Sequence, residues 1–484
     1  MNAPKSETEI YRPRNPKATD LHRVIRENYL QTFHDREING ITFPFHLKRE
    51  FERYLTCGIL AYGFARFHCS HCQKDLLVAH SCKGRTICPS CSGRRMADTA
   101  KHLVEQVIPE VPVRQWVLSM PFRHRFILST DSKLLSSIMG IYHRAISGFY
   151  RQKAKKLKLK SPQTGAISVI QRFGGALNVN VHFHSVFMDG VYFENRQGKM
   201  VFKEIKPDDN DVITLAEKLK IRINRAFEKK GLLDEDAVTD GNDEERQLEL
   251  FRAESVQNLV DGINKPKAVG KYGNPPFKEF GGKKCAYNDG FSLHAKVKIL
   301  AHQRSALEKL CRYISRGALA KERISLNDEG NVLLKLKTSY SNGTIHLLFT
   351  PDQFIKRIIA LIPRPRQNLI RYFGLFGARH RNRKEITSKA RPKKDKSKKK
   401  KIYRTPWAEL LKRVFKVDVT YCENCGTKLE LIATITSFTV CQTILNHLKF
   451  DSEQICANSP RDPPQVYEQS EMGHNFDENQ EYNW

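Results

Sequence analysis

The sequence has no apolar stretch long enough to span a bilayer. Its first 20 residues are polar and lack the apolar core of a cleavable signal peptide. These absences exclude a membrane-spanning protein, and we expect a soluble, cytoplasmic protein with no membrane partner. With 484 residues, the chain can bury a sizeable core and accommodate about two to four domains.

Acidic residues are also scarce, with 52 Asp and Glu against 82 Lys and Arg, and the formal net charge is +30. Residues 451–484 depart from this trend with a net charge of −7, so the rest of the chain carries +37. This excess favours a polyanionic partner, because each Lys or Arg placed on a phosphate releases condensed counterions. We therefore expect a nucleic-acid partner rather than an unspecific basic surface.

Without an export signal, we expect the twelve cysteines to be reduced and available to a metal. Two pairs, Cys69-x2-Cys72 and Cys88-x2-Cys91, are separated by 15 residues, a spacing typical of a tetrahedral zinc site. We predict one zinc ion on these four thiolates and a role for the module in recognising DNA ends. Further candidate ligands in the module are Cys57, Cys82, His68, His71 and His80. Basic residues expected to help bind DNA are Lys83, Arg85, Arg94 and Arg95.

A third pair, Cys422-x2-Cys425, is only half of a metal site. Cys441 and His447 are the residues that could complete it. We do not predict metal there from the sequence.

Periodicity predicts an α+β protein. Helical patterns cover residues 18–56, 94–109, 131–160, 213–231, 302–316 and 351–361. Strand patterns cover residues 113–122, 166–173, 178–193, 332–338 and 343–349.

The sharpest chemical signal is the strand pattern NVNVHFHSVF at 178–187. Alternate residues of a strand share a face, so His182 and His184 would point together while Phe183 anchors the opposite face. Two such imidazoles can bind one divalent metal that polarises a phosphate, and Mg²⁺ or Mn²⁺ suits this chemistry better than Zn²⁺. The alternative is two exposed histidines without a metal. Candidates for a third ligand are Gln171, the first choice on the adjacent predicted strand, and then Asp189 and His294.

A second signal is Tyr313, at the edge of the apolar stripe of a predicted helix and flanked by Arg312 and Arg316. Guanidinium groups can stabilise a phenolate and bind the phosphate that it attacks. Taken alone, the pattern would more often belong to a tyrosine that only packs. Tyr372 competes for the nucleophile's role, but it lies in the proline- and arginine-rich segment 362–374, which is expected to guide the DNA strand. There we expect the basic residues to contact DNA phosphates, namely Arg364, Arg366 and Arg371.

These residues lie in stretches that resemble the rolling-circle transposases of the insertion sequence 91 family, in the HUH endonuclease superfamily. The resemblance is collinear from about residue 18 to 450. The matching stretches are LTCGILAYGFARFHCSHC, SCKGRTICPSCSGRRM, VPVRQWVLSMPF, QRFGGALNVNVHFHSVFMDGVY, FSLHA, LEKLCRYISRGALAKERISL, LIPRPRQNLIRYFG and YCENCGTKLELIATI.

The resemblance implies an N-terminal transposase zinc-binding domain and a nuclease with an antiparallel sheet backed by helices. It implies His182 and His184 as the histidine pair and Tyr313 as the nucleophile. The implied reaction cuts one strand, forms a 5′-phosphotyrosine and frees a 3′-OH. Some relatives carry a second tyrosine four residues later, where this chain has Gly317, so it resembles the single-tyrosine branch.

We expect DNA as the main partner, chiefly single-stranded or hairpin element ends, with the host replication machinery as a further candidate. The expected regions are a zinc-binding region at 18–95, a nuclease at 110–375, a basic linker at 376–401, a C-terminal region at 402–450 and an acidic, disordered tail at 451–484.

Two alternatives stay open. A replication initiator or relaxase would share the histidines and tyrosine, and a zinc-containing DNA-binding regulator would cut nothing.

Overall fold

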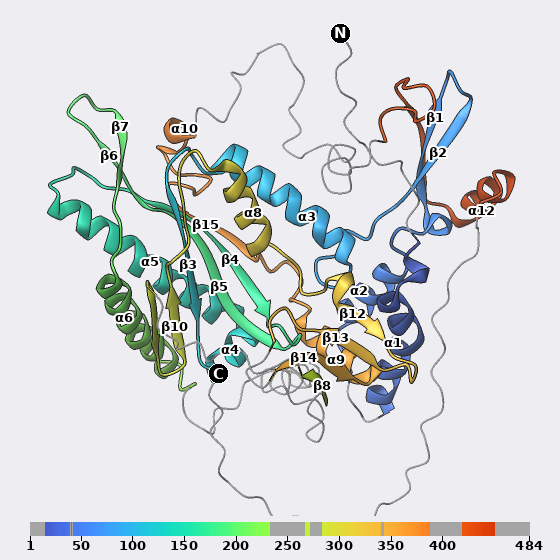
Figure 1. Ribbon diagram of the computed structural model, residues 1–484, viewed down its shortest axis with the longest axis horizontal. Helices are drawn as coiled ribbons and strands as arrows, with labels where there is room; N and C mark the ends of the chain where they lie inside the picture. The colour runs from blue at the N-terminus through green and yellow to red at the C-terminus, as the bar shows by residue number, and fades with distance from the viewer. Residues whose placement is uncertain are drawn as a thin grey trace, which may run out of the picture.

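The computed structural model describes residues 15–38, 40, 42–232, 267–271, 283–339, 343–387 and 419–450. Most of the predicted basic linker, residues 402–418 of the C-terminal region and the acidic tail lie outside the described residues. The protein is α+β, as predicted, with antiparallel sheets and flanking helices (Figure 1). None of the helices in the described part of the chain is long and apolar enough to cross a membrane.

The central sheet has seven antiparallel strands, and six of them follow in the order β15-β4-β5-β3-β10-β9, with β11 also pairing with β3. The predicted strands at 113–122 and 166–173 are confirmed. The predicted strand 178–193 is divided in the structure into β5, in this sheet, and β6 (Gly190–Glu194), which pairs with β7 (Met200–Glu204) in a separate hairpin, and β15 was not predicted. The bounds are β3 (Val113–Ser119), β4 (Gly165–Phe173), β5 (Val179–Met188), β9 (Cys285–Asn288), β10 (Phe291–His294), β11 (Lys298–Ile299) and β15 (Ile370–Gly374).

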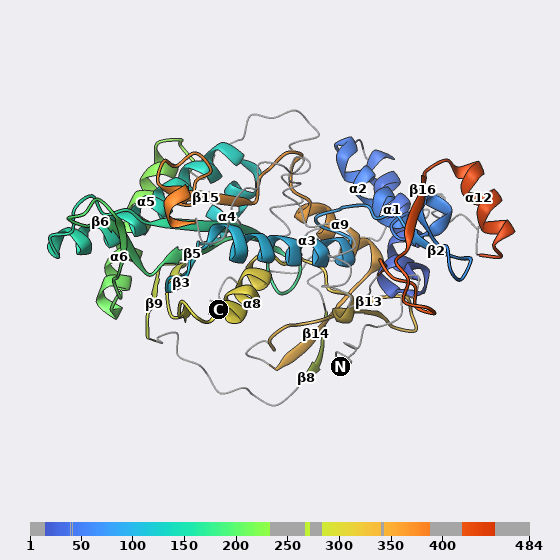
Figure 2. The same ribbon diagram turned by 90° about the horizontal axis from the view of Figure 1, so that it is seen from above.

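Helices cover both faces of this sheet, so the second half of β5 is buried on both faces. Phe183 and Phe187 pack against Tyr142 of α5, while Val186 belongs to the apolar cluster of α8. Figure 2 shows α4 and α5 on one side of the sheet and α8 on the other. One face carries α4 (Phe122–Thr130), α5 (Ser132–Lys156) and α6 (Asp209–Glu228). The other carries α8 (Arg304–Ile314) and the end of α3 (Pro89–His102), which continues as a π-helical turn, η3 (Leu103–Val107).

The N-terminal helices share the main apolar core with the rest of the chain. They are α1 (Asp20–Ile38) and α2 (Phe45–Leu55), and α1 packs against α9 (Pro351–Leu361). Thr350 caps α9 through two bonds: its hydroxyl accepts from the backbone NH of Gln353, and its own backbone NH donates to Oε1 of Gln353. A second sheet lies beside them, with β12 (Ile324–Leu326), β13 (Val332–Lys335), β14 (Thr344–Phe349) and β8 (Lys267–Lys271).

A three-stranded sheet joins the two ends of the described chain, because β16 pairs with β1. Its strands are β1 (Phe64–Cys69), β2 (Lys74–Ala79) and β16 (Glu430–Ile435), followed by α12 (Phe438–His447). The remaining elements are the hairpin β6 (Gly190–Glu194) and β7 (Met200–Glu204), α10 (Arg383–Ile386) and the short helices η1 (Pro16–Ala18), η2 (Leu60–Tyr62) and η4 (Lys321–Arg323).

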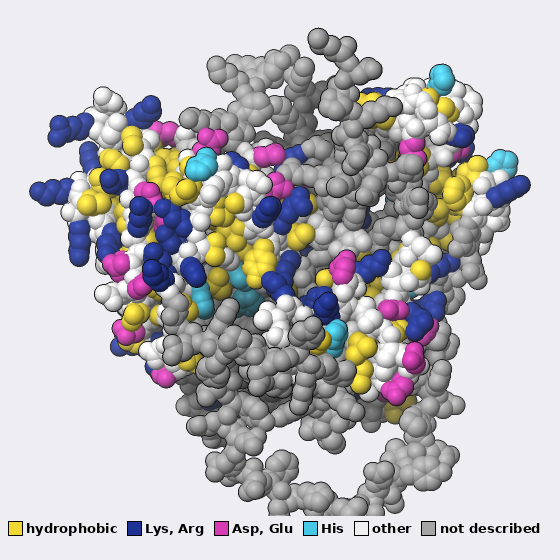
Figure 3. Space-filling model, viewed as in Figure 1, with side chains coloured by type: hydrophobic (Ala, Val, Ile, Leu, Met, Phe, Trp, Pro, Cys, Tyr) yellow, Lys and Arg dark blue, Asp and Glu magenta, His cyan; other side chains and the backbone are white. Residues whose placement is uncertain are grey.

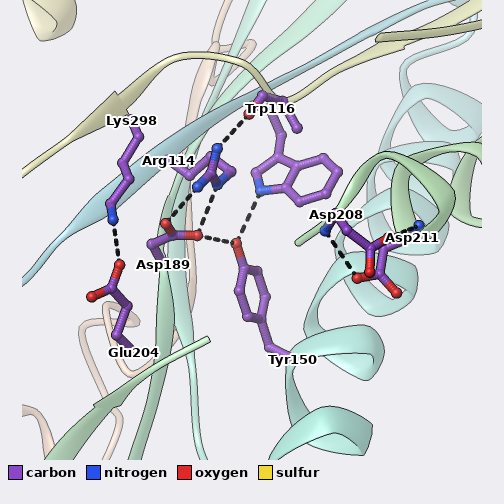
Figure 4. A network of polar contacts seen from close by, with 9 residues as sticks. Arg114, Trp116, Tyr150, Asp189, Glu204, Asp208, Asp211 and Lys298 are labelled. Carbon is purple, nitrogen blue, oxygen red and sulfur yellow. Dashed lines mark hydrogen bonds and ion pairs between the residues drawn. The ribbon is translucent and has the colours of Figure 1, made fainter. Parts of the chain in front are cut away.

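A buried polar network locks the α5 face of the central sheet (Figure 4). Arg114 donates two hydrogen bonds to Asp189, from Nε at 2.8 Å and from Nη2 at 2.7 Å, and a third to the carbonyl oxygen of Ala295. Tyr150 donates to Asp189 at 3.0 Å and accepts from the indole NH of Trp116 at 3.3 Å. The pairing of Arg114 with Asp189 stabilises the fold, because a buried charge without a partner would lower the free energy of unfolding.

Candidate active site and cysteine clusters

The histidine pair lies on β5, on the face covered by α8. The ring centroids of His182 and His184 are 4.9 Å apart. His182 donates from Nδ1 to the carbonyl oxygen of Asn180 at 2.9 Å, which leaves Nε2 as a metal ligand. Burial lowers the pKa of His182 to about 4 and that of His184 to about 3. Both imidazoles are therefore neutral at pH 7, the form that coordinates metal.

Gln115 of β3 orients the second imidazole, since its side-chain amide lies 2.9 Å from Nδ1 of His184. An amide can present either its NH2 or its oxygen at this position. A metal on Nε2 of His184 would require the oxygen to face Nδ1–H. The sequence analysis did not identify Gln115, which the pairing of β3 with β5 brings beside the histidine.

Gln171 lies opposite His182 in the pairing of β4 with β5, so its side chain shares the histidine face. Its amide nitrogen donates to the carbonyl oxygen of Ile314, at the end of α8, at 2.8 Å. Its Oε1 is buried and, within the described residues, has no hydrogen-bond partner. The same is true of Oδ1 of Asn180. Unpartnered buried amide oxygens beside two neutral imidazoles fit a divalent metal.

The two alternative third ligands are placed differently. Both carboxylate oxygens of Asp189 are engaged by Arg114 on the opposite, α5 face of the sheet, so Asp189 is not available to this site. His294 lies in the same row as His184, but β3 runs between their strands. Two strand spacings separate their backbones by about 10 Å.

Tyr313 is the tyrosine that the structure brings to the histidines. It sits on the last turn of α8, with its ring edge-on to that of His184, at 5.8 Å between centroids and 87° between planes. The apolar side of α8 is buried on the sheet, and Tyr313 stays 39% exposed. The phenol is therefore accessible to solvent while it is held on a helix that packs on the sheet.

Two cations flank the phenol. The guanidinium of Arg316 lies 4.9 Å from the centre of the Tyr313 ring, and the amine of Lys337 lies 4.3 Å from it. Arg312, in contrast, pairs with Glu308 at 3.0 Å on its own helix. Lys337 follows β13 and was missed in the sequence, because nothing local marks a lysine that folds back on a helix 24 positions earlier.

Tyr372 lies on the edge strand β15, opposite Ile167 of β4, with β4 between it and the histidine strand. Burial raises the pKa of Tyr372, which disfavours the phenolate. Of the two competing tyrosines, Tyr313 is the one with a ring contact to His184.

Close packing against Ser92 explains why the position four residues after Tyr313 is a glycine, Gly317. A Cβ there would lie 2.2 Å from Oγ of Ser92 and 3.0 Å from its Cβ. Ser92 is buried at the start of α3, directly after Cys91. The end of the tyrosine helix therefore rests closely on the cysteine module.

The cysteines of that module form a local cluster of Cys57, Cys82, Cys88 and Cys91, whose sulfur atoms all lie within 4.8 Å of one another. Sγ of Cys57 is 3.6 Å from those of both Cys88 and Cys91. Backbone NH groups of Cys82 and Gly84 point at sulfurs, at 3.3 and 3.2 Å. Hydrogen bonds from Cys82 and Cys88 lower the pKa of Cys57 to about 7. Thiolates with these donors suit zinc.

A second group, the long-range cluster, consists of Cys69, Cys72, Cys422 and Cys425, again with all sulfurs within 4.8 Å. The prediction of one site on Cys69, Cys72, Cys88 and Cys91 is therefore wrong in its grouping. Cys69 and Cys72 lie at the tip of the β1–β2 hairpin, away from Cys88 at the start of α3. Cys441 does not complete the Cys422 pair, because it is buried in an apolar cluster with Phe64 and Leu445.

Comparison with known families agrees with this geometry. Residues 25–120 match the transposase zinc-binding domain of the insertion sequence 91 type, and residues 165–384 match the family described as "Putative transposase". The chain belongs to the insertion sequence 91 transposases. No curated protein and no solved structure matches it.

The basic residues of this transposase fall into two groups. Around the local cluster, Arg85 donates to the carbonyl oxygen of Gln367 at 2.8 Å and Arg95 donates to that of Lys83 at 2.8 Å. Arg94 donates to Sγ of Cys91 at 3.5 Å, so it serves the metal cluster. The expected phosphate contacts that remain are at least partly accessible to solvent, namely Lys83, Arg316, Arg364, Arg366 and Arg371.

A further basic surface lies at the end of α5 and on the β6–β7 hairpin (Figure 3). Exposed cations in this region are Arg151, Lys155, Lys156, Lys158, Lys160, Arg196, Lys199 and Lys203. A transposase acts on DNA, and this surface continues the positive charge away from the tyrosine.

Proposed function

We propose that this transposase cuts single-stranded DNA at the ends of its element, with Tyr313 as the nucleophile, and rejoins strands during rolling-circle transposition. The observation that carries the proposal is the edge-on contact of Tyr313 with His184. This contact brings a helix-borne phenol beside two neutral imidazoles and a buried amide oxygen, which supports Tyr313 as the nucleophile.

The proposed metal ligands are His182, His184 and Gln171. Their donor set is two imidazole nitrogens and one amide oxygen, which suits Mg²⁺ or Mn²⁺. Such an ion would polarise the scissile phosphate and offset the negative charge that develops on its oxygens. Gln171 has a second task, since its amide nitrogen ties the end of α8 to β4.

Arg316 and Lys337 hold the substrate phosphate and stabilise the phenolate of Tyr313. Both cations already lie within 5 Å of the ring centre. In the reaction, the phenolic oxygen forms a bond to phosphorus while the bond from phosphorus to the 3′ oxygen breaks. The phenol gives up its proton and the departing oxygen takes one up as a 3′-OH. The product is a 5′-phosphotyrosine that a second strand can later resolve.

The zinc module contributes to binding of the DNA ends. Arg85 bridges the loop of the local cluster to the segment that carries Arg364 and Arg366. The two basic segments are thus joined beside the tyrosine helix. Binding of single-stranded ends should weaken with salt, with a slope of about −0.7 per phosphate contacted.

The decisive experiment is substitution of Tyr313 with Phe, which removes only the attacking oxygen. With a labelled single-stranded end and Mn²⁺, the covalent adduct should fall by more than about a thousandfold, the scale for removing a nucleophile. DNA affinity and zinc content should stay unchanged, because the ring still packs on α8.

Tyr372→Phe is the matched control, as it removes the same atom from the competing tyrosine on β15. It should still form the adduct, at most more slowly. Sequencing the labelled peptide identifies the attached residue. A label on Tyr372, or an adduct that persists in Tyr313→Phe, would show that Tyr313 is not the nucleophile.

The histidine pair is tested separately by His182→Ala and His184→Ala. Each should abolish nicking and spare DNA binding, since neither touches the basic surfaces. Full nicking by the double variant would refute the metal site.

A further inference from the structure

We propose that the long-range cluster of Cys69, Cys72, Cys422 and Cys425 binds a second zinc ion, which clasps the C-terminal segment 419–450 onto the N-terminal β1–β2 hairpin. The transposase zinc-binding match covers residues 25–120 and so contains only half of these ligands. Cys69 and Cys425, from the two halves of the cluster, are 356 positions apart in sequence and 3.5 Å apart at sulfur.

The separation of the sulfurs fits a tetrahedral ion. With a zinc–sulfur bond of about 2.3 Å, the edge of the sulfur tetrahedron is about 3.8 Å. All four sulfurs lie within 4.8 Å of one another, and the Cys69–Cys425 pair is at 3.5 Å. Two turns supply two thiols each, and the spacing of the four sulfurs matches the tetrathiolate geometry of structural zinc.

The two halves of the cluster also share one backbone conformation. The residue after each Cys-x2-Cys pair has a positive φ, 53° at Gln73 and 71° at Gly426. Each donates its backbone NH to the carbonyl oxygen of the first cysteine of its pair, at 2.8 Å in both cases. The turns thereby present both sulfurs of each pair on one side, and the NH of Cys72 approaches Sγ of Cys69 at 3.4 Å.

The surroundings are those of a structural site. Cys69 and Cys422 are buried with Leu429, and Phe67 and Leu76 pack against them. Beyond the cluster, β1 pairs with β16 along the strand, and Ile435 and Leu445 join an apolar cluster with Phe64. The ion would thus complete a small module formed by the β1–β2 hairpin and the segment 419–450. Its bonds to both parts would stabilise the pairing of β1 with β16.

The test is metal counting on the full chain. Wild-type protein loaded with Co²⁺ should show thiolate-to-cobalt absorption for two tetrathiolate ions per chain. The histidine pair contributes no thiolate, so a metal bound there does not enter this count. Cys422→Ser/Cys425→Ser should halve the absorption, and Cys441→Ser, a control cysteine outside the cluster, should leave it unchanged.

Hydrogen exchange then tests the clasp. Amides of β1 should exchange at least about tenfold faster in the double variant, because their partners on β16 are no longer held. Absorption for only one ion in the wild type would overturn the proposal, as would an unchanged count in the double variant. A disulfide between any two of the four cysteines in freshly isolated protein would also overturn it. None of these results depends on whether Tyr313 cuts DNA.

Discussion

The two four-cysteine clusters have the same composition, but one joins neighbouring parts of the chain and the other joins distant parts. All ligands of the local cluster fall between Cys57 and Cys91, and the cluster holds the end of α2 against the start of α3. The long-range cluster joins the β1–β2 hairpin to a segment that follows the region of the transposase match, residues 165–384. The local cluster lies against the tyrosine helix through Ser92 and Gly317, whereas the long-range cluster lies at the far end of the molecule (Figure 1).

The difference teaches that two cysteine clusters in one chain can have unlike structural roles. Losing the local cluster should disturb the core and the site together, since α3 packs against α8. Losing the long-range cluster should chiefly free one peripheral segment. Three predictions follow this contrast, in order of expected effect.

Cys88→Ser should have the largest effect. Removing Cys88, one of three buried thiolates among the four of the local cluster, weakens zinc binding, and zinc-binding free energy is folding free energy in such modules. We expect a loss of zinc, a destabilisation of several kcal/mol and a loss of nicking. Cys422→Ser should lower the free energy of unfolding by clearly less. Denaturant unfolding with metal analysis measures the free energy of unfolding and the zinc content of both variants. Equal losses of unfolding free energy in Cys88→Ser and Cys422→Ser would contradict the proposed difference between the clusters.

Gly317→Ala should have an intermediate effect, because its Cβ would lie 2.2 Å from Oγ of Ser92. Overpacking of this kind costs about 1–3 kcal/mol, and a small shift of α8 should slow nicking by roughly ten- to a hundredfold.

The matched control is Gly93→Ala, one residue after Ser92, where a Cβ meets nothing within 4 Å in the described structure. It should be neutral or slightly stabilising. Ser92→Gly should relieve part of the cost of Gly317→Ala in a double-mutant cycle. Strictly additive effects would mean that the two residues do not press on each other.

Arg85→Ala should have the smallest effect. It removes the hydrogen bond from the zinc-module loop to the carbonyl oxygen of Gln367, worth about 1 kcal/mol, and should weaken binding of DNA ends. Arg66→Ala is the counterpart near the long-range cluster, where Arg66 pairs with Asp75 at a partly exposed site. That pair is worth about 0–1 kcal/mol, and DNA affinity should not change. If Arg66→Ala weakened DNA binding more than Arg85→Ala, the DNA contact would lie near the long-range cluster rather than the local cluster, and the prediction would be wrong.

Much of the candidate site could be predicted from local pattern. The alternation in residues 178–187 put His182 and His184 on one face, because strand side chains alternate whatever the sheet around them. The apolar stripe of residues 304–314 likewise placed Tyr313 at the edge of a buried helix. Gln171 lay on the neighbouring strand as expected, opposite His182.

Other features had no local signal. The segment 362–374 looked like a proline-rich DNA guide, yet its second half, β15, closes the edge of the central sheet. Lys337 reaches Tyr313 only because the second sheet lies beside α8. Asp189 had the right chemistry for a ligand, but its partner Arg114 is 75 positions away and holds it on the other face.

The sequence by itself determined the positive charge, the faces of the histidine strand and of the tyrosine helix, and the family resemblance. The charge follows from composition. The two faces follow from the side-chain periodicity of a strand and of a helix, which the local backbone sets over a few residues. Only the tertiary structure decided which cysteines come together, which tyrosine meets the histidines and why a side chain at position 317 would collide with Ser92. Those outcomes depend on close packing between segments that are distant along the chain. Spacing along the sequence does not determine such distances, as the pairing of Cys69 with Cys425 demonstrates.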